Sequence, residues 1–270
     1  MTNNSVHVCV KELRKTYQTR RDDIEAIRLV DMEITEVEFV SILGPSGCGK
    51  STLLMIVGGL LPITSGRVEI GSERVSGPRR DTGVVFQAPV LMPWRSIVKN
   101  VMFPIESLGL SQLEYRERAN ELLEMTGLTG FRENYPSELS GGMQQRVALA
   151  RCLANDPDVI LMDEPLGALD ALTREKMQGL VLKLWKETGK TIMLITHSVE
   201  EAVLLGERLL VLAPRPGRIL KEYKLPYAEM GSGMDLREVK KSEGYIETRD
   251  EILSIIWEME EEIMGRVEND

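Results

Sequence analysis

The sequence is poor in cysteine and has no long hydrophobic run. Its three cysteines, Cys9, Cys48 and Cys152, form no CxxC pair and cannot all pair with one another. We therefore expect a reducing compartment, the cytoplasm, rather than a disulfide framework. The longest apolar stretch, residues 53–63, is too short to span a bilayer and contains two glycines and a proline. No basic segment followed by an apolar run opens the chain, so we expect no secretory signal.

Positive charge is also scarce towards the end of the chain. Residues 221–270 hold seven Lys and Arg against fourteen Asp and Glu, which is −7 of the net charge of −9. The remainder is nearly neutral, and this argues against nucleic acid as a partner. A chain of 270 residues can bury about three quarters of its unfolded surface. We expect one ordinary domain with an acidic appendage.

A glycine-rich loop stands between an apolar strand pattern at residues 38–43 and an apolar helix pattern at residues 52–60. It reads Gly-Pro-Ser-Gly-Cys-Gly-Lys-Ser, a complete phosphate-binding loop in the context that the motif requires. Its backbone N–H groups wrap a β-phosphate, Lys50 neutralises the β and γ oxygens, and Ser51 ligates Mg²⁺. The predicted nucleotide ligands here are Gly44, Pro45, Ser46, Gly47, Cys48, Gly49, Lys50, Ser51 and Thr52.

A second glycine motif lies far downstream. Ser140, Gly141 and Gly142 open a helical pattern, where unpaired N–H groups, a hydroxyl and the helix dipole favour an anion. Residues 159–162 then read as a buried strand that delivers Asp163 and Glu164 at its carboxyl end. One carboxylate can hold a metal while the next positions a water. The chain therefore carries two phosphate-directed glycine motifs.

Together these motifs resemble the ATP-binding cassette (ABC) ATPases, over roughly residues 1–220. Residues 139–146 correspond to the family signature, and Asp163 and Glu164 to the Walker B pair. The resemblance implies an α/β fold: a P-loop NTPase (RecA-like) core with an antiparallel β edge, residues 1–87 and 156–220. It further implies an inserted helical subdomain, residues 88–155, and leaves a C-terminal extension, residues 221–270. In this family the signature of one subunit closes over the nucleotide of another, so we expect an ATP-dependent homodimer.

The resemblance also assigns roles to four isolated residues. Tyr17, which we place in a polar turn, would stack on adenine, and Gln87, after a strand at residues 84–86, would reach Mg²⁺ and the attacking water. Asp170 would cross the dimer interface, and His197, after a strand at residues 191–195, would sense the γ-phosphate. Each has a simpler reading: a half-exposed loop tyrosine, a satisfied strand-end amide, a helix cap, and a core or capping imidazole.

Two further features concern local backbone and the tail. Val37 stands at a turn where the family usually has glycine, so either the turn keeps φ negative or a small strain is accepted. In the tail, Gly231 and Gly233 predict a linker. The apolar residues Ile252, Ile256, Met259 and Ile263 follow on one helix face. Such a helix packs on its own domain or serves as a partner or regulatory helix.

The implied reaction is hydrolysis of MgATP to ADP and phosphate. Glu164 orients and deprotonates the water for in-line attack. The catalytic set that the resemblance implies is Glu164, His197, Gln87 and Lys50, and the Mg²⁺ ligands are Ser51, Gln87 and Asp163. Three classes compete: a transporter subunit, a soluble ABC ATPase of DNA repair or translation, and a non-catalytic binder. The absence of coiled-coil insertions and of a second cassette disfavours the soluble class, and the intact motifs disfavour the non-catalytic one.

Residues 91–101 and 215–219 are similar to the nitrate, sulfonate and taurine importer subfamily. Trp94 beside Arg95 suits an interface anchor, although a Trp capping a helix start is the simpler reading. The implied partners are a second copy of the chain, membrane permease subunits and, indirectly, a periplasmic or extracellular solute-binding protein. The chain would lie on the inner face of the cell membrane, held there by the permease.

Overall fold

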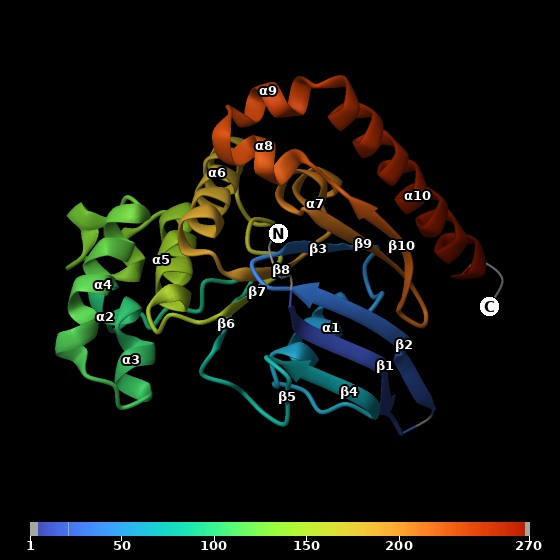
Figure 1. Cartoon of the computed structure of the whole chain (residues 1–270), viewed down its shortest axis with the longest axis horizontal. Coiled ribbons are helices and arrows are strands. Elements are labelled where there is room, and N and C mark those ends of the chain that lie inside the picture. The colour runs from blue at the N-terminus through green and yellow to red at the C-terminus, as the bar shows by residue number, and fades with distance from the viewer. Residues whose placement is uncertain (1–4, 21, 268–270) are drawn as a thin grey trace. The chain divides into compact units, whose positions relative to one another are not determined.

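The computed structural model describes residues 5–20 and 22–267 and divides the chain into two compact units (Figure 1). The first unit joins the residues up to Arg79 with those from Thr191 onward, and the second runs from Arg80 to Lys190. Residues 1–4, considered above for a secretory signal, lie outside the described ranges. Within those ranges, no helix is long and apolar enough to cross a membrane.

The first unit contains an antiparallel sheet in the order β2-β1-β4-β5. Its strands are β1 (Val6–Gln18), β2 (Asp23–Thr35), β4 (Ser65–Ile70) and β5 (Glu73–Arg74). A second group of strands follows the order β10-β9-β3-β8, in which β9, β3 and β8 run parallel and β10 runs antiparallel. These are β3 (Phe39–Leu43), β8 (Thr191–Thr196), β9 (Arg208–Ala213) and β10 (Arg218–Lys224). Every residue of β3 and β8 is buried, which is why both read as continuous apolar runs.

Five helices of the first unit are described. They are α1 (Lys50–Val57), α7 (Val199–Leu205), α8 (Tyr227–Gly233), α9 (Leu236–Lys241) and α10 (Glu243–Val267). Gly231 and Gly233 lie inside α8, so the predicted linker is wrong. Tyr227 and Ala228 at the start of α8 are buried, and this packing outweighs the poor helix propensity of the glycines.

The second unit is mainly helical. Its elements are β6 (Thr82–Val85), α2 (Ile97–Val101), α3 (Phe103–Ser107), α4 (Gln112–Met125), the short 3₁₀ turns η1 (Thr129–Phe131) and η2 (Pro136–Glu138), α5 (Gly141–Leu153), β7 (Val159–Asp163) and α6 (Ala171–Thr188). β6 and β7 pair in parallel. α5 is packed against α2, α3, α4, α6 and β6, and is therefore the central helix of this unit.

The turn between β2 and β3 resolves the two readings of Val37. Its φ is 65°, so the turn accepts strain rather than keeping φ negative. A β-branched residue in this region costs on the order of 1–3 kcal/mol. Hydrogen bonds hold the turn in place, because Val37 N donates to Thr191 Oγ1 at 3.0 Å and Thr35 N donates to Glu38 at 2.7 Å.

The C-terminal helix packs on its own unit, as the simpler of the two readings predicted. Ile252, Ile256 and Met259 are buried, and α10 contacts α7. Tyr245 anchors its first turns: it is fully buried, meets the Tyr227 ring edge-on at 5.2 Å, and donates to the Glu200 carbonyl oxygen at 3.3 Å. Burial raises the pKa of the Tyr245 hydroxyl, which keeps it protonated as a donor.

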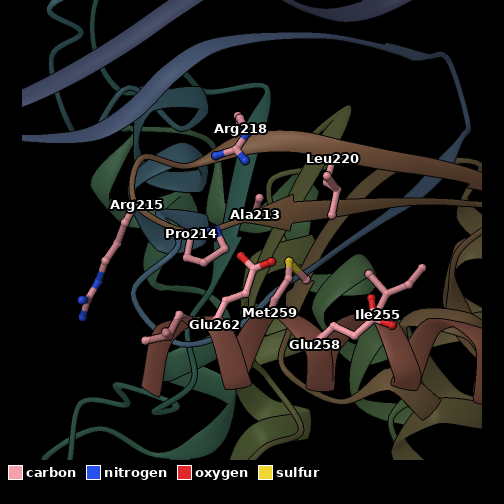
Figure 2. A pocket seen from close by; sticks show the side chains of 10 residues that line it. Ala213, Pro214, Arg215, Arg218, Leu220, Ile255, Glu258, Met259 and Glu262 are labelled. Carbon is pink, nitrogen blue, oxygen red and sulfur yellow. The ribbon is translucent and has the colours of Figure 1, made fainter. Parts of the chain in front are cut away.

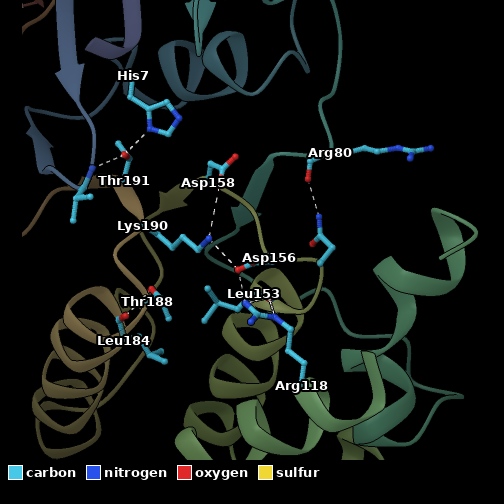
Figure 3. A network of polar contacts seen from close by, with 12 residues as sticks. His7, Arg80, Arg118, Leu153, Asp156, Asp158, Leu184, Thr188, Lys190 and Thr191 are labelled. Atoms are coloured by element: carbon cyan, nitrogen blue, oxygen red, sulfur yellow. Dashed lines mark hydrogen bonds and ion pairs between the residues drawn. The ribbon is translucent and has the colours of Figure 1, made fainter. Parts of the chain in front are cut away.

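A polar cluster in the second unit joins α4 to the segments that follow α5 and α6 (Figure 3). Asp156 accepts from Arg118 at 2.6 Å and lies 2.9 Å from the Lys190 ammonium. Burial opposes ionisation of Asp156, but the hydrogen bond from Lys190 and the charge of Arg118 outweigh it and lower its pKa. Arg118 and Lys190 together neutralise the charge of Asp156, whose backbone has a φ of 56°.

Replacing Tyr245 tests whether α10 is part of the folded unit. Tyr245→Ala should lower the free energy of unfolding by about 3–5 kcal/mol, because it empties a buried aromatic site. Tyr245→Phe keeps the ring and should cost only about 1 kcal/mol for the lost hydrogen bond. Urea unfolding followed by circular dichroism measures both, and equal losses would contradict the importance of ring packing.

The Asp156 cluster predicts a pH-dependent contribution to stability. Because the folded pKa is lowered, the stabilisation is present above the unfolded pKa of about 3.9 and disappears as pH falls through the folded value. Asp156→Asn should cost roughly 0.5–1 kcal/mol near neutral pH, since the carboxylate is half exposed and screened by solvent. Asn also tolerates the left-handed backbone. Urea unfolding of both proteins between about pH 6 and about pH 3 should show the difference shrinking, and a constant difference would refute the electrostatic origin.

Candidate nucleotide-binding site

The phosphate-binding loop folds around the side chain of Lys50. Its ammonium donates to the carbonyl oxygens of Gly44 at 2.7 Å and Pro45 at 3.1 Å, and Lys50 is buried. Gly47 and Gly49 adopt φ of 77° and 94°, which L side chains rarely adopt. The loop therefore holds a cation at the start of α1, where N–H groups and the helix dipole also favour phosphate.

Neighbouring backbone leaves no room beside this loop. A Cβ at Gly49 would lie 2.9 Å from the Ala26 carbonyl oxygen, and one at Gly44 would lie 2.6 Å from that of Leu212. A side chain at Gly217 would collide with the Cys48 carbonyl oxygen. A Pro-Gly dipeptide in a sequence signals only a turn, so this close contact of Gly217 is visible only in the structure.

Cys48 is not a reactive thiol. It is buried, and burial raises its pKa while the nearby Lys50 charge opposes the rise. The protonated thiol is the unreactive form. Cys9 and Cys152 are likewise free, and burial raises the pKa of Cys152 to about 12.

Tyr17 lies in β1, near its end, and not in the polar turn that we predicted. It pairs there with Ile24 across an antiparallel ladder, which the weak alternation of the sequence did not reveal. Its ring is 36% exposed, and its hydroxyl lies 3.4 Å from Thr52 Oγ1 on α1. The structure thus brings Tyr17 and the helix that follows the phosphate loop together in one unit.

His197 follows β8 at the same sheet edge as the phosphate loop. Leu43 and Thr196, the last residues of β3 and β8, are register partners, so Gly44 and His197 leave neighbouring parallel strands side by side. His197 is exposed, which rules out a core imidazole, and Ser198 rather than His197 caps α7. Thr196 donates to Glu201 at 2.8 Å and holds this strand end in place.

In the second unit, the acidic pair and Gln87 follow two paired strands. Val85 and Met162 are register partners in β6 and β7, so Gln87 and Asp163 lie at the same edge. β6 ends at Val85, one residue earlier than the strand that we predicted. Gln87 is exposed. Glu164 has φ 47°, a strained conformation that clusters at functional sites.

The signature and Asp170 are also brought together in this unit. Ser140 caps α5 by accepting from Met143 N at 3.4 Å, and Ser140 and Gly141 are exposed. Gly142 is buried where a Cβ would collide with the side chain of Thr173. Asp170 caps the neighbouring α6, accepting from Leu172 N and Thr173 N at 3.1 and 3.0 Å.

The cap reading of Asp170 is therefore correct for the isolated chain. The hydrogen bonds from Thr173 lower the pKa of Asp170, with a further contribution from Leu172 N. Asp170 stays charged at neutral pH and lies in the open, since its side chain is exposed. This placement leaves the carboxylate accessible beside the signature helix.

The predicted metal ligands Ser51, Gln87 and Asp163 are all oxygen donors, which suit Mg²⁺ better than a transition metal. In the part of the chain that the structure describes, no cluster of three or more His, Cys, Asp or Glu could hold an ion by itself. Each predicted ligand, taken singly, is an oxygen donor of the kind that Mg²⁺ prefers: a serine hydroxyl in the first unit, and a glutamine amide and a carboxylate in the second.

A buried lysine inside a glycine loop, between a parallel strand and a helix, defines a P-loop nucleotide-binding protein. The family model described as ABC transporter matches residues 27–167. The chain is 64% identical over 245 residues to the "Taurine import ATP-binding protein TauB" of Ruegeria pomeroyi, covering 91% of each. It is 45% identical to the "Uncharacterized ABC transporter ATP-binding protein MJ0412" of Methanocaldococcus jannaschii, over 93% of this chain and 91% of that one.

Solved structures agree. The ATP-binding cassette MJ0796, a dimer bound to ADP and Pi, superposes with a TM-score of 0.72 at 41% identity, over 81% of this chain and 98% of that chain. The chain cbiO1 from Clostridium perfringens gives a TM-score of 0.73 at 27% identity, over 90% and 98%. The chain belongs to the ABC transporter family, as an ATP-binding cassette that hydrolyses ATP. The predicted family, fold class and ATPase activity are confirmed.

Two glycine variants test the geometry of the phosphate loop. Gly49→Ala should weaken ATP binding by roughly tenfold or more, because its Cβ meets the Ala26 backbone as well as a positive φ. Gly47→Ala is the matched control: its φ is also positive, but nothing lies within 4 Å of its Cβ, so it should weaken ATP binding distinctly less than Gly49→Ala does. Titration with a fluorescent ATP analogue measures both, and equal effects would show that crowding is irrelevant.

Proposed function

We propose that the chain is the ATPase subunit of an importer for small sulfonates such as taurine. The observation that carries the proposal is its 54–64% identity, over at least 91% of the chain, to four proteins named as taurine import ATP-binding proteins. These names favour import over a soluble ABC ATPase that is not coupled to transport. The solute itself would contact other subunits, since this chain supplies the nucleotide chemistry.

In the proposed mechanism, Lys50 exchanges the carbonyl oxygens that now hold it for the β and γ oxygens of ATP. Mg²⁺, when bound by Ser51, Asp163 and Gln87, supplies positive charge to the phosphates. Glu164 accepts a proton from the attacking water, and its strained backbone holds the carboxylate at the end of β7. His197 hydrogen-bonds the γ-phosphate from the end of β8 and senses its loss.

Two copies of the chain would share each nucleotide. The exposed Ser140 and Gly141 at the start of α5 offer N–H groups and a hydroxyl to a phosphate held by another copy. Asp170, exposed next to them, would reach the partner's phosphate loop. The solved relative MJ0796 is described as dimeric, which supports this arrangement.

We place the membrane partner's contact on the second unit. Three of its large apolar side chains, Val90, Trp94 and Leu113, are 63%, 73% and 80% exposed, and Trp is enriched among the residues that anchor interfaces. Trp94 does not cap a helix, because α2 begins at Ile97 after Ser96. We assign these residues to a permease contact on the inner face of the membrane. A solute-binding protein would reach this chain only through that permease.

Glu164→Gln tests both hydrolysis and dimer formation. The variant should bind MgATP, lose roughly 10²–10⁴-fold in steady-state hydrolysis, and shift from monomer to dimer with MgATP in light scattering. Glu133→Gln, whose carboxylate is 75% exposed, is the control and should hydrolyse normally. Hydrolysis by Glu164→Gln at the normal rate would remove this residue as the base.

Uptake of labelled taurine tests the transport assignment. Cells that lack the chain should lose uptake, the natural chain should restore it, and Glu164→Gln should not. Full uptake without the chain, or with the Gln variant, would refute a role in powering import.

A further inference from the structure

A cavity of about 220 Å³ lies inside the first unit, between the turn joining β9 to β10 and the last turns of α10 (Figure 2). Pro214, Leu220, Ile255, Met259 and Ile263 supply its apolar lining. Sites for drug-sized ligands start at about 300 Å³, so this cavity suits a smaller molecule. The mechanism of ATP hydrolysis uses none of these residues.

Charges of opposite sign face the cavity from its two sides. Arg218 stands on the strand side, whereas Glu258 and Glu262 rise from α10, and Figure 2 shows the Glu262 carboxylate directed towards the turn. Arg215, also at the edge, points away from the cavity in the same view. A ligand between the two sides would therefore meet a cation at one end and carboxylates at the other.

These charged groups are not paired with one another. Among the residues that the structure describes, neither Arg218 nor Glu262 forms an ion pair, although Lys221 on the same strand contacts Glu251 of α10 at 2.7 Å. Between β10 and α10, an ion pair therefore joins Lys221 to Glu251, whereas Arg218 and Glu262 line a cavity without an ion pair. A charge that lacks a protein partner is the kind of group that a ligand can satisfy.

The turn that lines the cavity also touches the phosphate-binding loop. Gly217 N donates to Ala26 O at 3.0 Å, and Gly217 O accepts from Arg28 N at 2.9 Å. Its Cα lies so close to the Cys48 carbonyl oxygen that no side chain fits. A ligand pressing on Pro214 and Arg218 would therefore act on a segment in direct contact with the ATP site.

We propose that this cavity is a regulatory site for a small zwitterion. The acid group pairs with Arg218, the ammonium group pairs with Glu262, and the methylenes between them rest on Met259. Sulfonate and carboxylate share the chemistry that Arg218 recognises. Binding alters the nucleotide affinity through the turn at Gly217, and the choice of taurine as the first probe rests on the proposed function.

Calorimetric titration of the whole chain tests the ligand class. Taurine and β-alanine are the sulfonate and carboxylate probes, and ethanesulfonate and ethylamine each carry only one of the two charges. At least one zwitterion should bind, and each single-charge compound should bind roughly tenfold or more weakly, because only one of the two ion pairs can then form. The stronger zwitterion identifies the acid group.

Variants locate the site. Arg218→Gln and Glu262→Gln should each weaken zwitterion binding by roughly tenfold or more. Glu260→Gln removes a charge from the same helix outside the lining and should bind normally. Saturating zwitterion should change the affinity for an ATP analogue in the natural chain, and nucleotide should change zwitterion affinity by the same factor. Both effects should vanish in the two lining variants.

Three results would overturn the proposal: no binding of either zwitterion to the natural chain, binding that survives both lining substitutions, or binding without any change in nucleotide affinity. Thermal melting confirms that each variant is folded before it is titrated. The uptake assays with Glu164→Gln leave Arg218 and Glu262 intact, so the transport assignment and the regulatory site can fail independently.

Discussion

The buried ammonium of Lys50 is the constraint on which the first unit depends. A charge taken out of water must be matched by hydrogen bonds, and the chain supplies them from the carbonyl oxygens of Gly44 and Pro45. Wrapping the loop that tightly requires left-handed backbone at Gly47 and Gly49. β3 ends beside β8, because Leu43 and Thr196 are register partners, so His197 follows at the same sheet edge as the loop.

Close packing around that loop extends its influence. Gly44 lies against Leu212, Gly49 against Ala26, and Gly217 against Cys48. At each point two backbone segments are in contact, with no flexible side chain between them. A small displacement of one segment therefore moves the other. The β9–β10 turn is thus mechanically part of the ATP site, although it lies almost 170 residues away from it in the chain. This is the physical reason why a cavity on its other side can influence nucleotide binding.

In the second unit, charged groups and hydrogen-bond donors lie at the ends of helices and strands. Ser140 caps α5, Asp170 caps α6, and Glu164 follows β7 at a positive φ. At the start of α5, the Ser140 side chain accepts from Met143 N, and the N–H groups of Gly141 and Gly142 have no partner within the helix and suit an anion. Glu164 follows a strand whose first four residues are buried and which pairs with β6, so the strained residue is attached to a well-packed element.

The sequence by itself determined the family, the phosphate loop, the buried strands and the helices around them. Those features are local: Gly44 to Ser51 carry their chemistry in eight consecutive residues, and buried parallel strands are continuous apolar runs. Even the apolar face of the last helix follows from spacing alone.

Only the tertiary structure decided the place of Tyr17 in a strand, the positive φ of Val37, the helix at Gly231 and Gly233, and the placement of Arg218 and Glu262 in the lining of one cavity. Each of these depends on partners distant in the chain, such as Thr191 for the turn at Val37. Local propensity is weak compared with such packing, so no pattern of neighbouring residues could have revealed them.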